Sequence, residues 1–250
     1  MRFVRFLNDA RITYGLIEGE EIEEISTTPF LPFERTGITH ELGSVRLLAP
    51  CLPSKIVAIG VNYKDHAAEM GRDLPKTPMF FYKPSTAVVG PGDQIVWPPE
   101  SERLDYEGEL CVVIGAVAKH VDRDRWREVV LGYTCGVDAT ARDLQLQDLQ
   151  WGRAKGFDTS APLGPWIETE VDPSDVRLVT RINGQVKQDS RTDQLIFDVP
   201  AIIAFVSSYV TLLPGDVIMT GTPSGVGPLS SGDDIEVDIE GIGVLECSVK

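Results

Sequence analysis

Short apolar runs separated by turn residues recur along the whole 250-residue chain. Runs of about four to eight residues that are rich in β-branched and aromatic side chains are typical of β-strands. In the first fifty residues this pattern predicts four strands, at Arg2–Phe6, Thr13–Ile17, Ile22–Ile25 and Val45–Leu48. Pro50 and Pro53 then interrupt the pattern. We therefore expect a small N-terminal β region over residues 1–50 and a larger domain over residues 51–250.

The larger domain continues the strand pattern. Its clearest strands are predicted at Lys55–Gly60, Met79–Tyr82, Leu104–Gly115 and Leu131–Asp138. The pair Asn183-Gly184 lies between two apolar runs and is a strong hairpin signal, because both residue types tolerate the positive φ angles of a tight turn. Gly241-Ile242-Gly243 is expected to join the last two strands.

Helices are few in this pattern. Residues 62–71 can form about two helical turns that end at Gly71. Ala139–Trp151 is a second candidate, and Pro200–Val210 is a third, with Asp198 near its N-terminus. Many strands and few helices predict an α+β, β-rich fold and argue against a doubly wound sheet.

Three acidic residues, Asp105, Glu107 and Glu109, alternate along the strand predicted at Leu104–Gly115. Alternate residues of a strand point to the same face, so these carboxylates repel one another unless a cation balances them. Asp138 ends another predicted strand and can join Glu107 and Glu109 as a third carboxylate. Such an all-oxygen site suits Mg²⁺, Mn²⁺ or Ca²⁺ better than Zn²⁺. The alternative is a row of solvated acids at a sheet edge, with Asp138 as an ordinary helix N-cap.

A histidine and a glutamate, His66 and Glu69, are three residues apart on the helix predicted at residues 62–71. At this spacing the carboxylate can orient the imidazole, and the pair can act as a general base toward water. A simple surface ion pair is the alternative.

Two further segments can bind an anionic substrate. Arg142 and Lys155 can clamp a carboxylate near the metal, or they can neutralise neighbouring acids. The glycine-rich segment Met219–Gly227 offers free backbone amides and two hydroxyls as an oxyanion cradle, although it can equally be an ordinary turn. It lacks the Gly-Lys-Ser/Thr ending of a P-loop, so nucleotide binding is not expected.

The chain is strongly acidic, with a formal net charge of -15 and a pI of about 4.6. This charge argues against nucleic acid and anionic membranes as partners, whereas a bound metal can still attract an anionic substrate. No apolar run reaches the roughly 18 residues that span a bilayer, and the N-terminus lacks the apolar core of a signal peptide. The four cysteines form no CxxC pair. We therefore expect a cytoplasmic protein.

Eight segments taken together resemble a known enzyme family. In chain order they are Gly60–Tyr63 with Asp65 and His66, Asp105–Leu110, Gly132–Thr134, Asp138–Asp143, Lys155–Asp158, Val186 with Gln188, Ile196-Phe197, and Thr220–Gly227. Each segment is short, but their number and order are specific. The chain resembles the fumarylacetoacetate hydrolase family, in its bacterial branch of acylpyruvate hydrolases, hydroxyheptadienedioate isomerases and oxaloacetate decarboxylases. The resemblance covers residues 50–250.

This resemblance implies a mixed β-sandwich or β-roll fold for the larger domain and a homodimeric assembly. It also implies that Glu107, Glu109 and Asp138 bind Mg²⁺ or Mn²⁺, which Ca²⁺ can replace in a crystal.

The resemblance implies roles for further residues. His66 and Glu69 match a catalytic dyad on a lid, here around Asn62–Pro78, that closes over the substrate, and Lys155 matches a catalytic lysine. The positions that match contacts to the oxo-acid end of the substrate are Arg142, Gln145, Thr220, Gly221 and Thr222.

The expected reaction is hydrolysis of a C–C bond in an acylpyruvate such as fumarylpyruvate. The metal stabilises an enolate, while His66 with Glu69 activates the attacking water. The same enolate serves oxaloacetate decarboxylation and 2-hydroxyhepta-2,4-diene-1,7-dioate isomerisation, so the metal site does not choose between them. A catalytically silent metal-binding or interaction protein is the alternative from another class, and the presence of His66, Glu69 and Lys155 argues against it.

Overall fold

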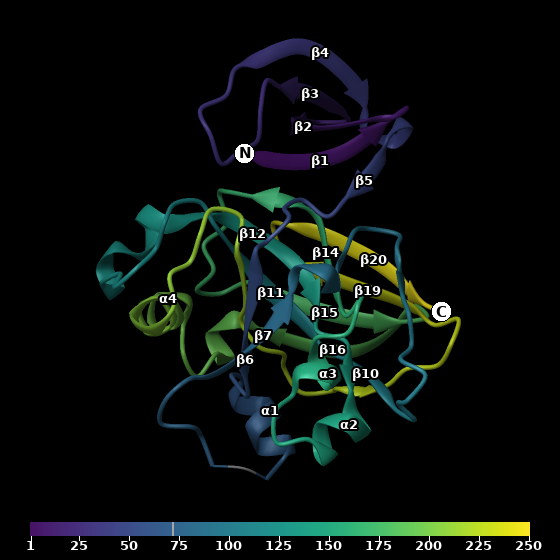
Figure 1. Ribbon diagram of the computed structural model, residues 1–250, viewed down its shortest axis with the longest axis vertical. Helices are drawn as coiled ribbons and strands as arrows, with labels where there is room; N and C mark the ends of the chain where they lie inside the picture. Colours follow the sequence, from purple (N-terminus) through teal and green to yellow (C-terminus); the bar gives the residue numbers. More distant parts are fainter. Residues whose placement is uncertain (72) are drawn as a thin grey trace.

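The computed structural model describes residues 1–71 and 73–250 (Figure 1). Within this described part, strands form a 12-stranded, a 5-stranded and a 3-stranded sheet, with four α-helices around them. The predicted α+β, β-rich class is confirmed. Figure 1 shows a small N-terminal lobe at one end of the molecule and a larger body below it.

The N-terminal lobe consists of five strands: β1 (Arg2–Asn8), β2 (Arg11–Glu18), β3 (Glu21–Ile25), β4 (Arg35–Glu41) and β5 (Arg46–Leu48). The strands of the body are β6 (Lys55–Gly60), β7 (Met79–Pro84), β8 (Val88–Val89), β9 (Gln94–Ile95), β10 (Leu104–Tyr106), β11 (Gly108–Ile114), β12 (Val130–Val137), β13 (Thr140–Ala141), β14 (Ala161–Glu168), β15 (Arg177–Ile182), β16 (Gln185–Arg191), β17 (Val217–Met219), β18 (Gly227–Pro228), β19 (Asp234–Ile239) and β20 (Gly243–Val249). The helices are α1 (Lys64–Glu69), α2 (Arg142–Gln147), α3 (Gly152–Lys155) and α4 (Val199–Tyr209). Short 3-10 turns cover Leu42–Ser44, Ser85–Ala87, Arg123–Val129 and Thr192–Gln194.

Strand β11 lies in the middle of the body and is buried on both faces. Leu110, Val112 and Ile114 pack into one core with the five-stranded sheet and α4. Cys111 and Val113 point the other way, into a second core that includes residues of the N-terminal lobe. Burial on both faces explains why this segment is continuously apolar and not alternating.

The N-terminal lobe is joined to the body by backbone pairing. Strand β1 pairs antiparallel with β14, with Arg2 opposite Glu168 and Phe3 opposite Ile167. The Arg2 side chain and the terminal amine also contact the Glu168 carboxylate. In Figure 1 the lobe lies at the opposite end of the molecule from α1, α2 and α3.

Two sequence predictions are wrong in detail. The strand predicted at Leu104–Gly115 is interrupted at Glu107, and its halves β10 and β11 belong to different sheets. The helix predicted at Ala139–Trp151 is replaced by β13, α2 and α3, because Thr140–Ala141 pairs with β10 and Asp148 takes an extended backbone. Strands β4 and β14 were not predicted.

Two turn and cap predictions are confirmed. The Asn183-Gly184 turn joins β15 to β16 with φ angles of 51° and 73°. Asp198 caps α4, where its carboxylate accepts a hydrogen bond from the Ala201 amide at 2.9 Å.

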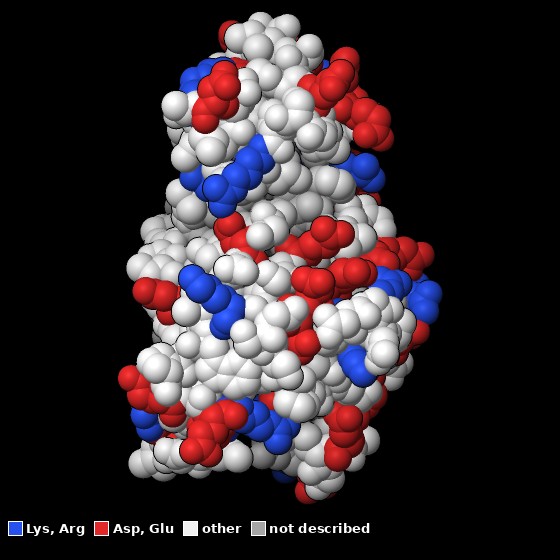
Figure 2. Space-filling model, turned by 90° about the vertical axis from the view of Figure 1, so that its right-hand side faces the viewer, with Lys and Arg blue, Asp and Glu red and all other residues white. Residues whose placement is uncertain are grey.

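The surface reflects the acidic composition. On the face shown in Figure 2, Asp and Glu side chains gather across the middle of the molecule, below the N-terminal lobe, whereas Lys and Arg are scattered. Among the described residues, no helix has the length and apolar character that crossing a membrane requires.

Candidate active site

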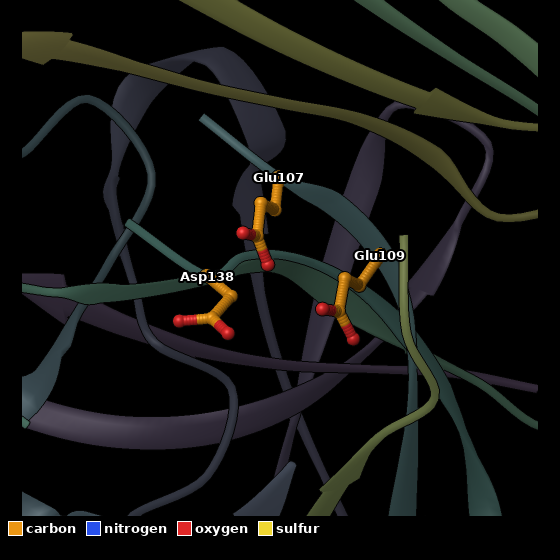
Figure 3. A group of neighbouring side chains, drawn as sticks. All are labelled: Glu107, Glu109 and Asp138. Carbon is orange, nitrogen blue, oxygen red and sulfur yellow. The ribbon is translucent and has the colours of Figure 1, made fainter. Parts of the chain in front are cut away.

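Strand pairing brings three carboxylates together in the body. Glu107 and Glu109 flank the start of β11, and Asp138 follows the end of β12. These strands pair with Gly108 opposite Val137, and the Asp138 amide donates to the Glu107 carbonyl at 2.9 Å. One oxygen from each carboxylate lies within 4.8 Å of the others, and Figure 3 shows the three groups converging. We call Glu107, Glu109 and Asp138 the carboxylate triad.

The carboxylate triad is buried. The exposed fractions are 7% for Glu107, 1% for Glu109 and 0% for Asp138. The alternative of solvated acids at a sheet edge is therefore wrong. The N-cap alternative for Asp138 is also wrong, because α2 begins at Arg142 with Ala141 as its N-cap.

Cationic side chains surround two members of the carboxylate triad. Lys155 Nζ, at the end of α3, lies 2.8 Å from Glu107 Oε2 and 2.6 Å from Asp138 Oδ2. Arg142 contacts the other Glu107 oxygen at 2.5 Å, and Lys83 contacts Asp138 Oδ1 at 2.5 Å. Both Asp138 oxygens and both Glu107 oxygens thus have a charged partner.

Sequence reasoning missed Lys83. It is fully buried, and it lies in β7 directly after the aromatic run Phe80-Phe81-Tyr82. The signal that could have identified Lys83 is its place at the end of an apolar strand run. A lysine buried there needs an acidic partner, because an unpaired lysine is almost never fully buried.

Glu109 differs from the other two carboxylates. Its Oε2 accepts a hydrogen bond from the Gly221 amide at 2.6 Å, and no ion pair in the described part of the chain involves it. Burial, with the neighbouring Asp138 and Glu107 carboxylates, raises the pKa of Glu109 well above its ordinary value. Burial alone would also raise the pKa of Glu107, but Lys155 and Arg142 outweigh it and lower that pKa to about 2.

This difference fits a divalent cation. A buried carboxylate that lacks a cationic partner is costly, and a metal ion beside Glu109 would supply that partner. The donors are all carboxylate oxygens, which suit hard ions such as Mg²⁺, Mn²⁺ or Ca²⁺. The buried Glu109 carboxyl, which has no cationic partner in the described part of the chain, is thus a structural reason to expect an ion at the carboxylate triad.

Gln188 supports the chain between the two glutamates. Its Oε1 accepts from the Gly108 amide at 3.0 Å, and its Nε2 donates to Thr222 Oγ1 at 2.7 Å. Thr222 Oγ1 in turn donates to the Gly108 carbonyl at 2.9 Å. A Cβ at Gly108 would lie 2.0 Å from Thr180 Oγ1, so only glycine fits there.

The predicted dyad lies on α1. His66 Nδ1 is 3.1 Å from Glu69 Oε2, and their side chains are 13% and 45% exposed. Both residues line a cavity of about 440 Å³ that the carboxylate triad also lines, together with Lys155. Of the lid predicted around Asn62–Pro78, residue 72 lies outside the described residues.

Of the five residues predicted to contact the substrate, three line the cavity and two do not. Arg142, Gln145 and Thr222 line this cavity. The guanidinium of Arg142 is engaged by Asp105 at 2.8 Å, by Glu107, and by Gln145 at 2.6 Å. Arg142 therefore balances acids in this structure, whatever it also does with substrate.

Thr220 and Gly221 lie behind Glu109. The Thr220 hydroxyl donates to the Leu110 carbonyl at 2.9 Å, and the Gly221 amide donates to Glu109. This geometry favours a supporting role for both residues over direct contact with a substrate.

The comparison with protein families decides the classification. Residues 55–250 match the family described as fumarylacetoacetate (FAA) hydrolase C-terminal. The chain belongs to the fumarylacetoacetate hydrolase family. Residues 1–50 match a second family, described as Rv2993c-like, N-terminal.

Similar members of this family carry different activities in their names. The 5-carboxymethyl-2-hydroxymuconate delta-isomerase structure from Mycobacterium smegmatis is 46% identical with a TM-score of 0.94, covering 100% of this chain and 99% of that one. A fumarylacetoacetate hydrolase from Exiguobacterium antarcticum is 37% identical with a TM-score of 0.91, covering 100% and 99%. Oxaloacetate tautomerase Fahd2a, mitochondrial, from Rattus norvegicus is 42% identical over 213 residues, 80% of this chain and 68% of that protein. The chain is thus an enzyme of a family whose members differ in reaction.

Proposed function

We propose that this protein is a divalent-metal-dependent enzyme that hydrolyses a C–C bond in a 2,4-dioxo acid, an acylpyruvate such as fumarylpyruvate. The supporting observation is that one cavity is lined both by the carboxylate triad and by the His66–Glu69 pair. Glu107, Glu109 and Asp138 would hold Mg²⁺ or Mn²⁺. A bound ion of this kind supplies Lewis-acid stabilisation of negative charge on the oxygen of a 2-oxo acid.

His66 acts as the general base in this proposal. Its Nδ1 faces Glu69, which leaves Nε2 to take a proton from water. The water oxygen then bonds to the C4 carbonyl carbon, and the C3–C4 bond breaks. The electron pair of that bond stays with the pyruvate half, which takes up a proton at C3.

The charged residues of the cavity orient the substrate. Lys155 is positioned by its contacts to Glu107 and Asp138 and carries a positive charge toward the oxo-acid end. Arg142, Gln145 and Thr222 would contact the same end, because they line the same cavity.

Isomerisation or keto–enol tautomerisation of a 2-oxo acid is the second candidate. Relatives named for an isomerase and for an oxaloacetate tautomerase are 46% and 42% identical to this chain. In these reactions His66 would move a proton at carbon instead of activating water. Oxaloacetate decarboxylation also needs no attacking water.

A substrate panel tests the proposal. Metal-depleted protein is supplied with Mg²⁺ or Mn²⁺ and assayed with acetylpyruvate, fumarylpyruvate, oxaloacetate and 2-hydroxyhepta-2,4-diene-1,7-dioate. Pyruvate release and the ultraviolet absorbance of the enol are followed, and kcat/KM is compared across the panel. We expect the highest kcat/KM for an acylpyruvate, with a requirement for metal.

Other outcomes identify the alternatives. A higher kcat/KM for the dienedioate, or for enol–keto exchange of oxaloacetate, would replace hydrolysis with the second candidate. If metal binds but every substrate is left intact, the protein is a metal-binding or interaction protein on the same scaffold.

Assembly, location and domain division stay proposals as well. We propose a cytoplasmic homodimer with a small β region over 1–50 and a catalytic domain over 51–250. Exposed apolar side chains on edge strand β7 and on α4, including Tyr82 and Tyr209, support a protein contact on that side. Light scattering after size-exclusion chromatography measures the mass: twice 27.4 kDa is expected.

A further inference from the structure

The connection between β6 and α1 contains a strained residue. Val61 has a φ of 45°, in the left-handed region that β-branched residues rarely adopt. The next residue, Asn62, is fully buried. Its side chain donates to the Phe197 carbonyl at 3.0 Å and to the Thr220 carbonyl at 2.8 Å. The chain is therefore anchored immediately after the strained residue, and α1 extends from that anchor.

The first turn of α1 is fastened to β16. Asp65 Oδ2 accepts a hydrogen bond from Ser190 Oγ at 2.9 Å. Asp65 Oδ1 accepts from the backbone amide of His66 at 2.7 Å. One carboxylate thus links Ser190 directly to the backbone of the residue that carries the proposed base.

A second contact holds the end of α1 that carries Glu69. The Gly225 amide donates to the Glu69 carboxylate at 3.2 Å. Gly225 itself lies against β16, since a Cβ at this position would be 2.1 Å from the Lys187 carbonyl oxygen. Both ends of α1 therefore depend on the position of β16.

The same side of β16 supports the carboxylate triad. Gln188 and Ser190 are two residues apart, so their side chains point the same way along the strand. Gln188 holds Gly108 between Glu107 and Glu109, and Ser190 holds Asp65. Strand β16 thus contacts both α1 and the chain between the two glutamates, and it fixes the position of α1 relative to the carboxylate triad.

We propose that Ser190 is a positioning residue that holds α1 closed over the cavity through Asp65, against the strained backbone of Val61. When the Ser190–Asp65 hydrogen bond is lost, the strain at Val61 is opposed only by the remaining contacts of the segment, chiefly those of Asn62, and α1 moves away with His66 more readily. This inference rests on the proposed function only in that His66 is taken to act on the substrate.

The experiment combines two variants in a double-mutant cycle. Ser190→Ala removes the hydroxyl, and Val61→Gly removes the backbone strain because glycine adopts positive φ freely. For Ser190→Ala we expect kcat to fall roughly ten-fold with KM little changed, the effect of one hydrogen bond to a charged group. Amide hydrogen exchange in residues 64–69 should become faster, while exchange in β11 and β12 stays as in the wild type. With Val61→Gly already present, Ser190→Ala should have a smaller effect on exchange.

Two further variants keep the test specific. Ser190→Thr retains the hydroxyl and should restore both kcat and the slow exchange of α1. Ser208→Ala is the matched control, since Ser208 is an exposed serine whose hydroxyl bonds within α4. If Ser190→Ala unfolds the protein, Asp65→Asn weakens the same contact from the other side.

The hydrogen-exchange measurement separates this inference from the proposed function. Wild-type exchange of α1 in Ser190→Ala, or an unreduced effect in the Val61→Gly background, overturns the inference whatever the reaction is. If α1 exchanges faster in Ser190→Ala but His66→Ala keeps full activity, the positioning role of Ser190 is supported and the proposal that His66 is the general base is wrong.

Discussion

The carboxylate triad and the α1 segment line the same cavity but are built in opposite ways. The triad sits on paired central strands, its members are at most 7% exposed, and Lys83, Arg142 and Lys155 surround it. The α1 segment is a single short helix with a 45% exposed glutamate side chain and a strained residue before it. It buries one residue, Ala67, and a few hydrogen bonds join it to the rest of the molecule.

This difference assigns metal binding to a rigid part of the cavity and substrate access to a part that can open. Side chains that bind a metal need to be held in place before the ion arrives, which buried strands and ion pairs provide. A segment that admits substrate must open at low cost in free energy, which few contacts and stored backbone strain allow. Each of the following variants perturbs one side of the cavity, either the carboxylate triad or α1.

The largest effect is expected from Glu109→Gln. Unlike Glu107, Glu109 has no cationic side-chain partner in the described part of the chain. Its replacement therefore leaves no buried lysine or arginine without a partner. Activity should fall by about 10³-fold or more, because a metal ligand supplies several kcal/mol of transition-state stabilisation. Because burial and the neighbouring carboxylates raise the pKa of Glu109, the metal-free variant should gain about 1–2 kcal/mol in free energy of unfolding, and this gain should grow as the pH rises and the wild-type carboxyl must ionise.

Activity assays with added Mn²⁺ and denaturant unfolding of metal-free protein check these two outcomes. Glu102→Gln is the control, because Glu102 is exposed. Wild-type turnover in Glu109→Gln would exclude Glu109 as a metal ligand.

His66→Ala attacks the α1 side. Removal of a general base should lower the kcat of acylpyruvate hydrolysis by about 10²–10³-fold, while metal affinity stays unchanged. Oxaloacetate decarboxylation, which needs no attacking water, should be spared. Steady-state kinetics and calorimetric Mn²⁺ binding measure both, with the exposed His120→Ala as the control. Equal loss of hydrolysis and decarboxylation would show that His66 is not a dedicated water-activating base.

Lys83→Met removes one positive charge beside the carboxylate triad and changes no residue that contacts α1. Methionine has a similar length, but Asp138 would keep only Lys155 as a cationic partner. The free energy of unfolding should fall by about 2–3 kcal/mol, somewhat less than the cost of leaving a buried charge with no partner. Hydrogen exchange in α1 should be unchanged. An equal rise in exchange in α1 and in β12 would mean that the two sides are not independent.

The smallest effect is expected from metal addition itself. Mn²⁺ at ten times its Kd should stabilise the fold by about 1.4 kcal/mol, because only the folded state assembles the carboxylate triad. Thermal unfolding with and without EDTA measures the shift. Protection from exchange should increase around β11 and β12 and not in α1, and protection confined to α1 would contradict the proposed metal site.

The local pattern of the chain determined most of its strands, its strongest turn and one well-capped helix, but not β4 or β14. Alternation at Asp105, Glu107 and Glu109 also predicted that these acids face one way, and all three line the cavity. Period-two alternation is a property of the backbone, so it can be recognised without knowing which strands pair.

Only the tertiary structure decided the partners of those acids. Lys83 lies 55 residues from Asp138 in the sequence, and Ser190 lies 125 residues from Asp65. The register of β11 against β12 places Asp138 beside Glu107, and the break at Glu107 follows from pairing in two different sheets. Non-local pairing depends on how sheets pack, which no short window of sequence contains, and it decides which buried charges are balanced and which one is left for a cation.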